Sequence, residues 1–180
     1  MHQSGTPDSY FELVIERAIK GDHKAFRKIY DAISANMYDV CLRFAGNEND
    51  ANDFFQEGFL RLYRKLKSFR GDCPFEGWAR KIFINVCIDY LKKNKVFSLV
   101  INPEFPVSAE SMNVYDKLSG EDIMKVIRRM PEGYRTVVNL FLVEGYNHKE
   151  IGEMLNISEE GSRTQLRRAR VNLKKALSSI

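Results

Sequence analysis

Apolar residues recur at spacings of three and four along almost the whole chain, and this period limits the fold more than any other feature. It is the period of an amphipathic helix, so an all-α fold is predicted. The period is lost only across residues 96–120, which hold two prolines and several serines. A connection of about 25 residues is long for a compact domain. The 180 residues are therefore expected to form two small helical domains, 8–95 and 121–180, joined by a linker.

Capping residues predict where the helices of the first domain begin and end. Ser9 and Glu12 form a capping-box pattern before the first helix, and Gly21 ends that helix. Asp22 is expected to cap the second helix, and Asp50 is expected to open the third. The stretch "RGDCPFEG" that follows is rich in turn formers and is predicted to be a loop before a fourth helix that starts with the Trp of "WARKIFINVCIDYLKKNK".

The second domain contains two short helices joined by a tight turn. Asn147 and Glu150 have the spacing of a capping box at the start of the first. Asn156 tolerates the left-handed conformation of a turn, and Ser158 is a good N-cap for the second helix. Gly152 allows the two helices to approach closely. This is the helix-turn-helix plan, in which the second helix enters the DNA major groove.

The second of these helices is basic on its outer side. Six positive charges and no negative charge lie between positions 163 and 175. An apolar stripe from Leu166 to Leu177 faces the other way, so the polar ridge is free to contact a polyanion. Arginine suits this role because its planar fork can bond guanine O6 and N7 together. A solvated surface helix is the alternative interpretation. The candidate DNA-contacting residues are Arg163, Thr164, Arg167 and Arg168.

An acceptor-rich surface is predicted on the third helix of the first domain. Positions 31–60 carry six acidic residues and one basic residue, so a partner of opposite charge is expected there. Asp53, Gln56 and Glu57 share one polar side of the helix, and such oxygens suit a partner that bears arginines. Matching of the helix dipole, with acids early and bases late, is the alternative explanation.

Aromatic and basic residues alternate around the predicted loop. Bases of single-stranded nucleic acid stack on aromatic rings while cations follow the phosphates. Trp78 also belongs to an apolar stripe with Ile82 and Val86, so a core position is the alternative for this residue. The candidate residues for single-strand contact are Phe69, Arg70, Phe75, Trp78, Arg80, Lys81 and Asn85.

Other classes of function find no support in the sequence. There is no phosphate-binding glycine loop, nucleophile elbow or His-Glu metal motif, so neither an enzyme nor a cofactor is expected. Cys41 and Cys87 are expected in the core and Cys73 in a loop, and their spacing matches no zinc pattern. No apolar run approaches a membrane span and the first residues lack a signal core, so a cytoplasmic protein is expected.

Two stretches resemble a known family. "GNENDANDFFQEGFLRLYRKLKSFRGDCPFEGWARKIFINVCIDYLKK" is similar to region 2 of bacterial RNA polymerase sigma factors, nearest to the extracytoplasmic-function group. It carries that group's "D-A-x-D-x-x-Q-E-x-F-L-R" pattern from Asp50 to Arg61. "MPEGYRTVVNLFLVEGYNHKEIGEMLNISEEGSRTQLRRAR" resembles region 4 of the same group, although Gly152 stands where alanine is usual and Asn156 where glycine is common.

The resemblance implies a transcription initiation factor. Region 2 of such a factor binds the clamp helices of the polymerase β′ subunit and captures the melted −10 strand, while region 4 reads the −35 duplex. Core RNA polymerase, including its β subunit, and promoter DNA are then the expected partners, with an anti-sigma factor as a further candidate. A helix-turn-helix regulator that does not bind core polymerase is the alternative.

Overall fold

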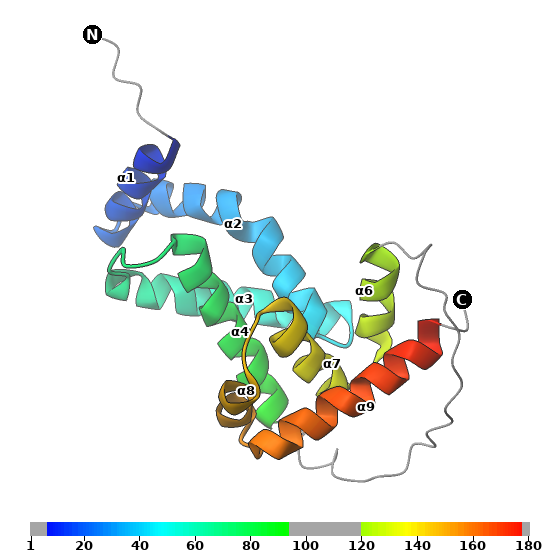
Figure 1. Ribbon diagram of the computed structural model, residues 1–180. Coiled ribbons are helices and arrows are strands. Elements are labelled where there is room, and N and C mark those ends of the chain that lie inside the picture. Colours follow the sequence, from blue (N-terminus) through cyan, green and yellow to red (C-terminus); the bar gives the residue numbers. More distant parts are fainter. Residues whose placement is uncertain (1–6, 94–119, 178–180) are drawn as a thin grey trace.

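The computed structural model describes residues 7–93 and 120–177, and these parts are helical without any strand (Figure 1). The prediction of an all-α chain is confirmed. The predicted linker lies almost entirely outside the described residues. The first half contains α1 (Pro7–Ile19), α2 (His23–Phe44), α3 (Glu48–Lys65), a 3₁₀ turn (Leu66–Ser68) and α4 (Phe75–Lys93). The second contains α6 (Gly120–Arg129), α7 (Glu132–Val138), a π-type turn (Asn139–Val143), α8 (His148–Leu155) and α9 (Glu159–Leu177).

Two of the predicted boundaries in the first domain are confirmed. The carboxylate of Asp22 accepts the backbone N–H groups of Lys24 and Ala25, which caps α2. Gly21 has a φ of +93°, a conformation that lets the chain turn sharply between α1 and α2 and that other residues rarely adopt.

Three predicted helix starts are wrong. α1 begins at Pro7 rather than after Ser9, and proline suits a first helical position because its φ is already set. α3 begins at Glu48 because Asn47 caps it and accepts the backbone N–H of Asp50. α4 begins at Phe75, before Trp78, because the chain turns helical directly after Pro74.

The first half is built around one close contact between α3 and α4. Gly58 of α3 lies against the ring of Phe83, which is fully buried. A methyl group at position 58 would come within 2.9 Å of Phe83 Cζ and closer still to two other ring carbons. The rings of Phe55 and Phe59 lie 6.2 and 5.2 Å from that of Phe83 and hold it in place. α3 and α4 are therefore fixed relative to each other.

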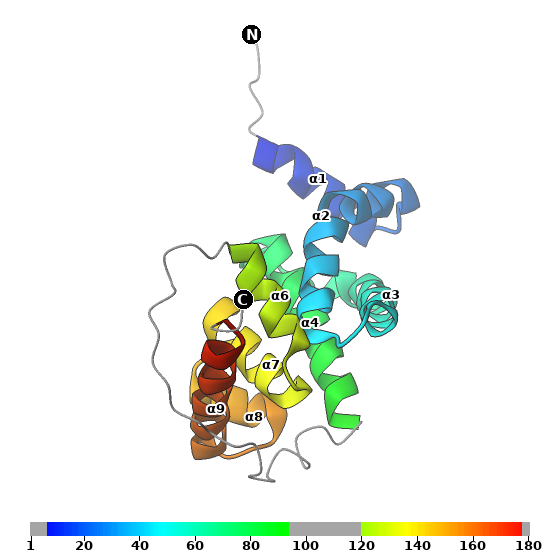
Figure 2. The same cartoon turned by 90° about the vertical axis from the view of Figure 1, so that its right-hand side faces the viewer.

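The two halves pack against each other rather than standing apart. α2 contacts α6 and α7, and α4 contacts α8, as two views of the chain show (Figures 1 and 2). Buried apolar residues of both halves belong to one continuous cluster. The relative placement of the two domains, which the sequence does not specify, is therefore defined by side chains at this junction.

Candidate functional sites

The helix-turn-helix forms as predicted. Asn147 and Glu150 make both hydrogen bonds of a capping box at the start of α8. Asn156 adopts the left-handed conformation with a φ of +57°, and Ser158 Oγ accepts the N–H of Gly161 at the start of α9. A Cβ at Gly152 would lie 2.8 Å from the carbonyl oxygen of Ile157, so α8 approaches the turn too closely for a side chain there.

His148 and Ser162 join the two helices of this motif. The His148 ring stacks on Phe141 with a centroid distance of 4.5 Å, and its Nδ1 lies 3.0 Å from the buried hydroxyl of Ser162. Burial is the main cause that lowers the pKa of His148 below its ordinary value, and the positive charge of Arg163 lowers it further. The neutral imidazole is therefore the form that fits this packing.

The basic side of α9 divides into two faces. Arg163, Arg167, Arg170 and Lys174 recur every three or four residues and line one open groove of about 480 Å³. Arg163 is also paired with Glu159 one turn earlier. The predicted residues Arg163 and Arg167 are thus brought together on an exposed face.

The other two predicted residues of α9 lie on a different side. Thr164 and Arg168 are half-buried and lie outside that groove. The pattern predicted one ridge of four residues, whereas each helical residue turns the chain by about 100°, so Thr164 and Arg168 each lie about 100° around the helix from the arginine that precedes them.

The predicted acceptor surface on α3 is exposed. Asp53 and Gln56 are exposed and Glu57 is half-exposed, and Leu60 follows on the same face with 52% of its surface accessible. Glu57 also accepts a hydrogen bond of 2.7 Å from Arg61, which in turn reaches Asp89 of α4. The face therefore combines free acceptors with an exposed leucine, which suits a protein partner better than a polyanion.

The loop between α3 and α4 is only partly available for stacking. Phe75 is buried, and its ring packs edge-on against Phe11 of α1 at 6.0 Å. Phe69 and Trp78 are half-buried and lie 5.2 Å apart, centroid to centroid. A cavity of about 640 Å³ opens between α1 and this loop, lined by these Phe residues and by Arg70.

The predicted polar and basic residues near this loop differ in their surroundings. Arg70, Lys81 and Asn85 are exposed, as a nucleic-acid contact requires. Arg80 is not free, because its guanidinium forms two hydrogen bonds, of 2.6 and 2.8 Å, to the carboxylate of Glu144 in the other domain. This pairing raises the pKa of Arg80 above its ordinary value.

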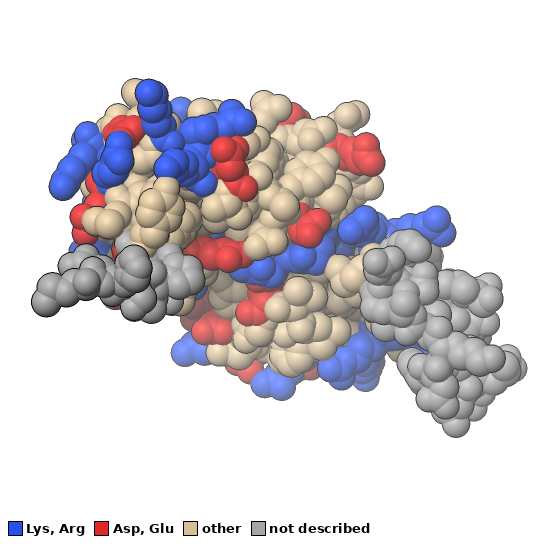
Figure 3. Space-filling view, turned by 90° about the horizontal axis from the view of Figure 1, so that it is seen from above, with Lys and Arg blue, Asp and Glu red and all other residues tan. Residues whose placement is uncertain are grey.

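Lys and Arg side chains gather densely at one corner of the face in Figure 3, while Asp and Glu are scattered over it.

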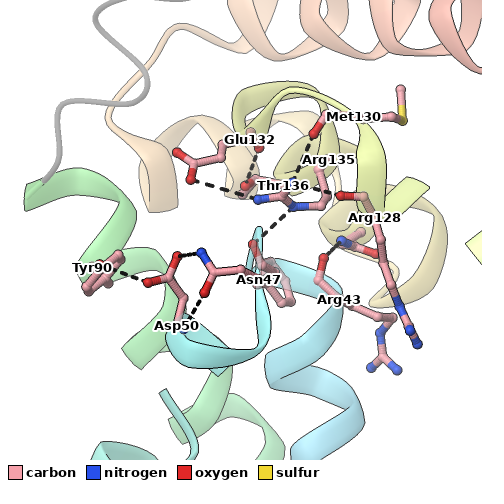
Figure 4. A network of polar contacts seen from close by, with 11 residues as sticks. Arg43, Asn47, Asp50, Tyr90, Arg128, Met130, Glu132, Arg135 and Thr136 are labelled. Atoms are coloured by element: carbon pink, nitrogen blue, oxygen red, sulfur yellow. Dashed lines mark hydrogen bonds and ion pairs between the residues drawn. The ribbon is translucent and has the colours of Figure 1, made fainter. Parts of the chain in front are cut away.

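Polar side chains of α7 and of the π-type turn after it bind the end of α2, and the sequence pattern did not predict them. Arg135 is 3% exposed, and its Nε donates to the carbonyl of Phe44 at 3.1 Å (Figure 4). Asn139 Nδ2 donates to the carbonyl of Arg43 at 2.6 Å. These carbonyls end α2 and lack partners within the helix. The available signal was a pair of polar residues four positions apart within the apolar run "YRTVVNLFLV".

The described ranges contain neither a cluster of metal ligands nor a membrane-spanning helix. Among residues 7–93 and 120–177, no three His, Cys, Asp or Glu side chains are grouped as metal ligands would be. None of the described helices is both long and apolar enough to cross a membrane.

Known families match both halves. The sequence model described as Sigma-70 region 2 matches residues 29–96, and that of Sigma-70, region 4 matches residues 120–173. Together they cover more than half of the chain.

Individual relatives and structures agree. The ECF RNA polymerase sigma factor SigW of Bacillus subtilis is 32% identical over 94% of this chain and 100% of its own length. The RNA polymerase sigma-H factor of Pseudomonas aeruginosa is 28% identical over 93% of each chain. The sigma factor RpoE of Bartonella quintana, solved with the anti-sigma factor NepR, superposes with a TM-score of 0.52 at 16% identity. That superposition covers 86% of this chain and 98% of the other, and at this identity it supports a likeness of fold alone.

Proposed function

We propose that separate surfaces of this chain, a member of the extracytoplasmic-function group of the sigma-70 family of RNA polymerase sigma factors, bind core polymerase, the −35 duplex and the melted −10 strand. The chain is a transcription initiation factor that binds core RNA polymerase and directs it to promoters. Sigma factors are non-catalytic, and the polymerase supplies the chemistry. Different surfaces of the two domains carry out the steps of this function, and the protein acts in the cytoplasm together with core polymerase.

The face of α3 is assigned to core polymerase. Asp53, Gln56 and Glu57 offer acceptor oxygens to arginines of a partner, and the exposed Leu60 beside them supplies apolar contact. An exposed apolar residue amid acceptors is the observation that favours a protein partner for this face. The β′ clamp helices are the partner that family membership suggests.

The groove on α9 is assigned to the −35 duplex. Arg163 and Arg167 lie near the N-terminal end of α9, the end that contacts base edges in a helix-turn-helix. Arg170 and Lys174 extend the same face toward the C-terminus and suit the phosphate backbone, which carries no sequence information.

The loop before α4 and the first turns of α4 are assigned to the melted −10 strand. Arg70 lines the cavity beside Phe69, and Lys81 and Asn85 are exposed on α4, which starts where this loop ends. An unstacked base needs a pocket with an aromatic wall and cations nearby. Because Phe75 is buried, Phe69 and Trp78 are the rings better placed to receive a base.

An anti-sigma factor is proposed as a regulatory partner. The support is the likeness of this fold to a sigma factor that was solved with one. Such a partner would have to cover the α3 face or the α9 groove to block initiation.

Replacing the loop tests the assignment of the −10 site. A Gly/Ser segment in place of residues 70–74 leaves Phe75 in the core and leaves the α3 face and α9 intact. The altered protein is expected to bind core polymerase normally but to give no permanganate-reactive thymines in the −10 region. A template with a pre-melted −10 bubble is expected to restore only part of the activity. Normal permanganate reactivity on duplex promoter would contradict the role of the loop and leave melting to α4.

A further inference from the structure

The junction between the domains contains a buried carboxylate held by two arginines. Glu144, at the end of the π-type turn after α7, has a side chain only 4% exposed. Its Oε2 lies 2.6 Å from Arg80 Nε, and its Oε1 lies 2.8 Å from Arg80 Nη2 and 3.2 Å from Arg43 Nη2. Both arginines belong to the first domain, whereas Glu144 belongs to the second, so this ion cluster exists only while the domains are packed together.

The packing of α2 against α4 places the two arginines on neighbouring helices. Arg43 lies in the last turn of α2, and Arg80 lies in the second turn of α4, and these helices pack directly within the first domain. Glu76, one turn before Arg80, accepts a hydrogen bond of 2.7 Å from Asn36. The first domain alone therefore contributes both guanidinium groups of this cluster.

We infer that Arg43 and Arg80 form an anion site which Glu144 occupies in the free protein and which a nucleic-acid phosphate occupies once the second domain moves away. The inference rests on the proposed binding of the melted strand by the first domain, since it adds a phosphate contact to that surface. A phosphodiester carries the same unit charge as the carboxylate. It is tetrahedral, so its oxygens can reach both guanidinium planes, including Arg43 Nε, which is buried and bonds to no atom among the described residues.

The other polar contacts at the junction are consistent with domains that can separate. Arg135 and Asn139 bind the last carbonyls of α2 through polar atoms, which water can replace when the domains part. A junction that combines such polar pairs with apolar contacts separates more readily than a purely apolar one. Glu144 thus competes with nucleic acid for Arg43 and Arg80, and this competition lowers the affinity of the free protein for single-stranded nucleic acid.

Binding of a fluorescein-labelled 20-nucleotide oligo-dT by the full chain, followed by anisotropy at fixed salt, tests the competition. Glu144→Gln keeps the side-chain shape but removes the charge, and it is expected to tighten binding about tenfold. Glu153→Gln removes the same charge from an exposed position of α8 and serves as the matched control, with affinity within about twofold of the unaltered chain. Adding Arg43→Gln and Arg80→Gln to Glu144→Gln is expected to abolish the gain.

Each alternative outcome has a definite meaning. Equal affinities of the Glu144→Gln and Glu153→Gln proteins, or a gain that survives loss of both arginines, would overturn the inference. Arg70→Gln in the Glu144→Gln protein separates this failure from that of the proposed function. If Arg70→Gln weakens binding while the arginine pair has no effect, the −10 assignment stands and the anion site is wrong. If neither change weakens binding, the strand binds elsewhere and both are wrong.

A distance measurement keeps the test independent of whether the arginine variants fold. Cys73 is exposed, whereas Cys41 and Cys87 are buried, so a spin label can be attached at Cys73 and at a Lys149→Cys substitution on α8. A single narrow distance distribution is expected in the unaltered pair and a broader one after Glu144→Gln. An unchanged distribution after Glu144→Gln would show that Glu144 does not hold the domains together.

Discussion

Gly58 and Phe83 form a complementary pair, and substitutions at both positions should not act independently. A methyl group at position 58 would overlap the Phe83 ring, which is fully buried and held by Phe55 and Phe59. Overpacking of a core costs about 1–3 kcal/mol, and this close an overlap with an immobile ring favours the upper value. Alanine gains about 1 kcal/mol over glycine within a helix. Gly58→Ala is therefore expected to lower the free energy of unfolding by about 2 kcal/mol.

The sign of the same substitution should reverse once the ring is removed. Phe83→Ala alone is expected to lower the free energy of unfolding by about 4 kcal/mol through lost burial and a cavity. In that background the methyl group at position 58 enters empty space and keeps its helix preference, so Gly58→Ala should raise stability by about 1 kcal/mol. The coupling between the two sites is then about 3 kcal/mol.

Urea unfolding followed by far-UV circular dichroism measures all four proteins of this cycle. For a chain of this size, Gly58→Ala should also lower Tm by about 4–8 °C. Destabilisation by Gly58→Ala of equal size in both backgrounds would refute the argument from Phe83. The result bears on function because α3 and α4 carry the proposed polymerase and −10 surfaces, and this contact fixes their relative position.

Three other predictions concern the two domains separately. Asp53→Arg combined with Glu57→Arg should abolish core polymerase binding in a pull-down while melting stays native-like, because the face is exposed; undiminished affinity would contradict the assignment. Promoter-specific initiation should fall with Arg163→Ala and with Arg168→Ala. The larger loss is expected for Arg163, which lines the groove and where a bidentate guanine contact is worth about 1–3 kcal/mol. An equal loss of binding to every DNA sequence would show that these residues contact phosphates only. Burial lowers the pKa of His148, so the unfolded chain binds the proton more readily than the folded one, and stability should fall as pH drops below the ordinary value of 6.5; His148→Gln should remove that part of the slope, and a slope unchanged in the variant would refute it.

Local signals predicted the second domain well. The Asn147 and Glu150 capping box, the left-handed Asn156 and the Ser158 cap are each decided by neighbouring residues, and all are present. The caps of α1 and α3 were misassigned because several polar residues compete near each start, and Asn47 accepts the N–H of the very residue, Asp50, that was expected to be the cap.

Contacts between distant residues could not be predicted from the pattern. Glu144 follows an apolar run and its partners Arg43 and Arg80 lie 101 and 64 positions away, so nothing in its sequence neighbourhood indicates that it is buried. Arg80 was a candidate for single-strand contact on composition alone, and only the packing of the domains shows that Glu144 holds it. The junction is tertiary, and helical periodicity contains no information on its partners.

Run-off transcription from genomic fragments with purified core polymerase measures whether this chain acts as an initiation factor. Discrete transcripts are expected only when core polymerase and this chain are both present, each preceded by two elements at a fixed separation. The protein that carries both Asp53→Arg and Glu57→Arg should give none of these transcripts. Specific binding of duplex by the chain alone, with no transcript that depends on core polymerase, would contradict the account and favour a helix-turn-helix regulator.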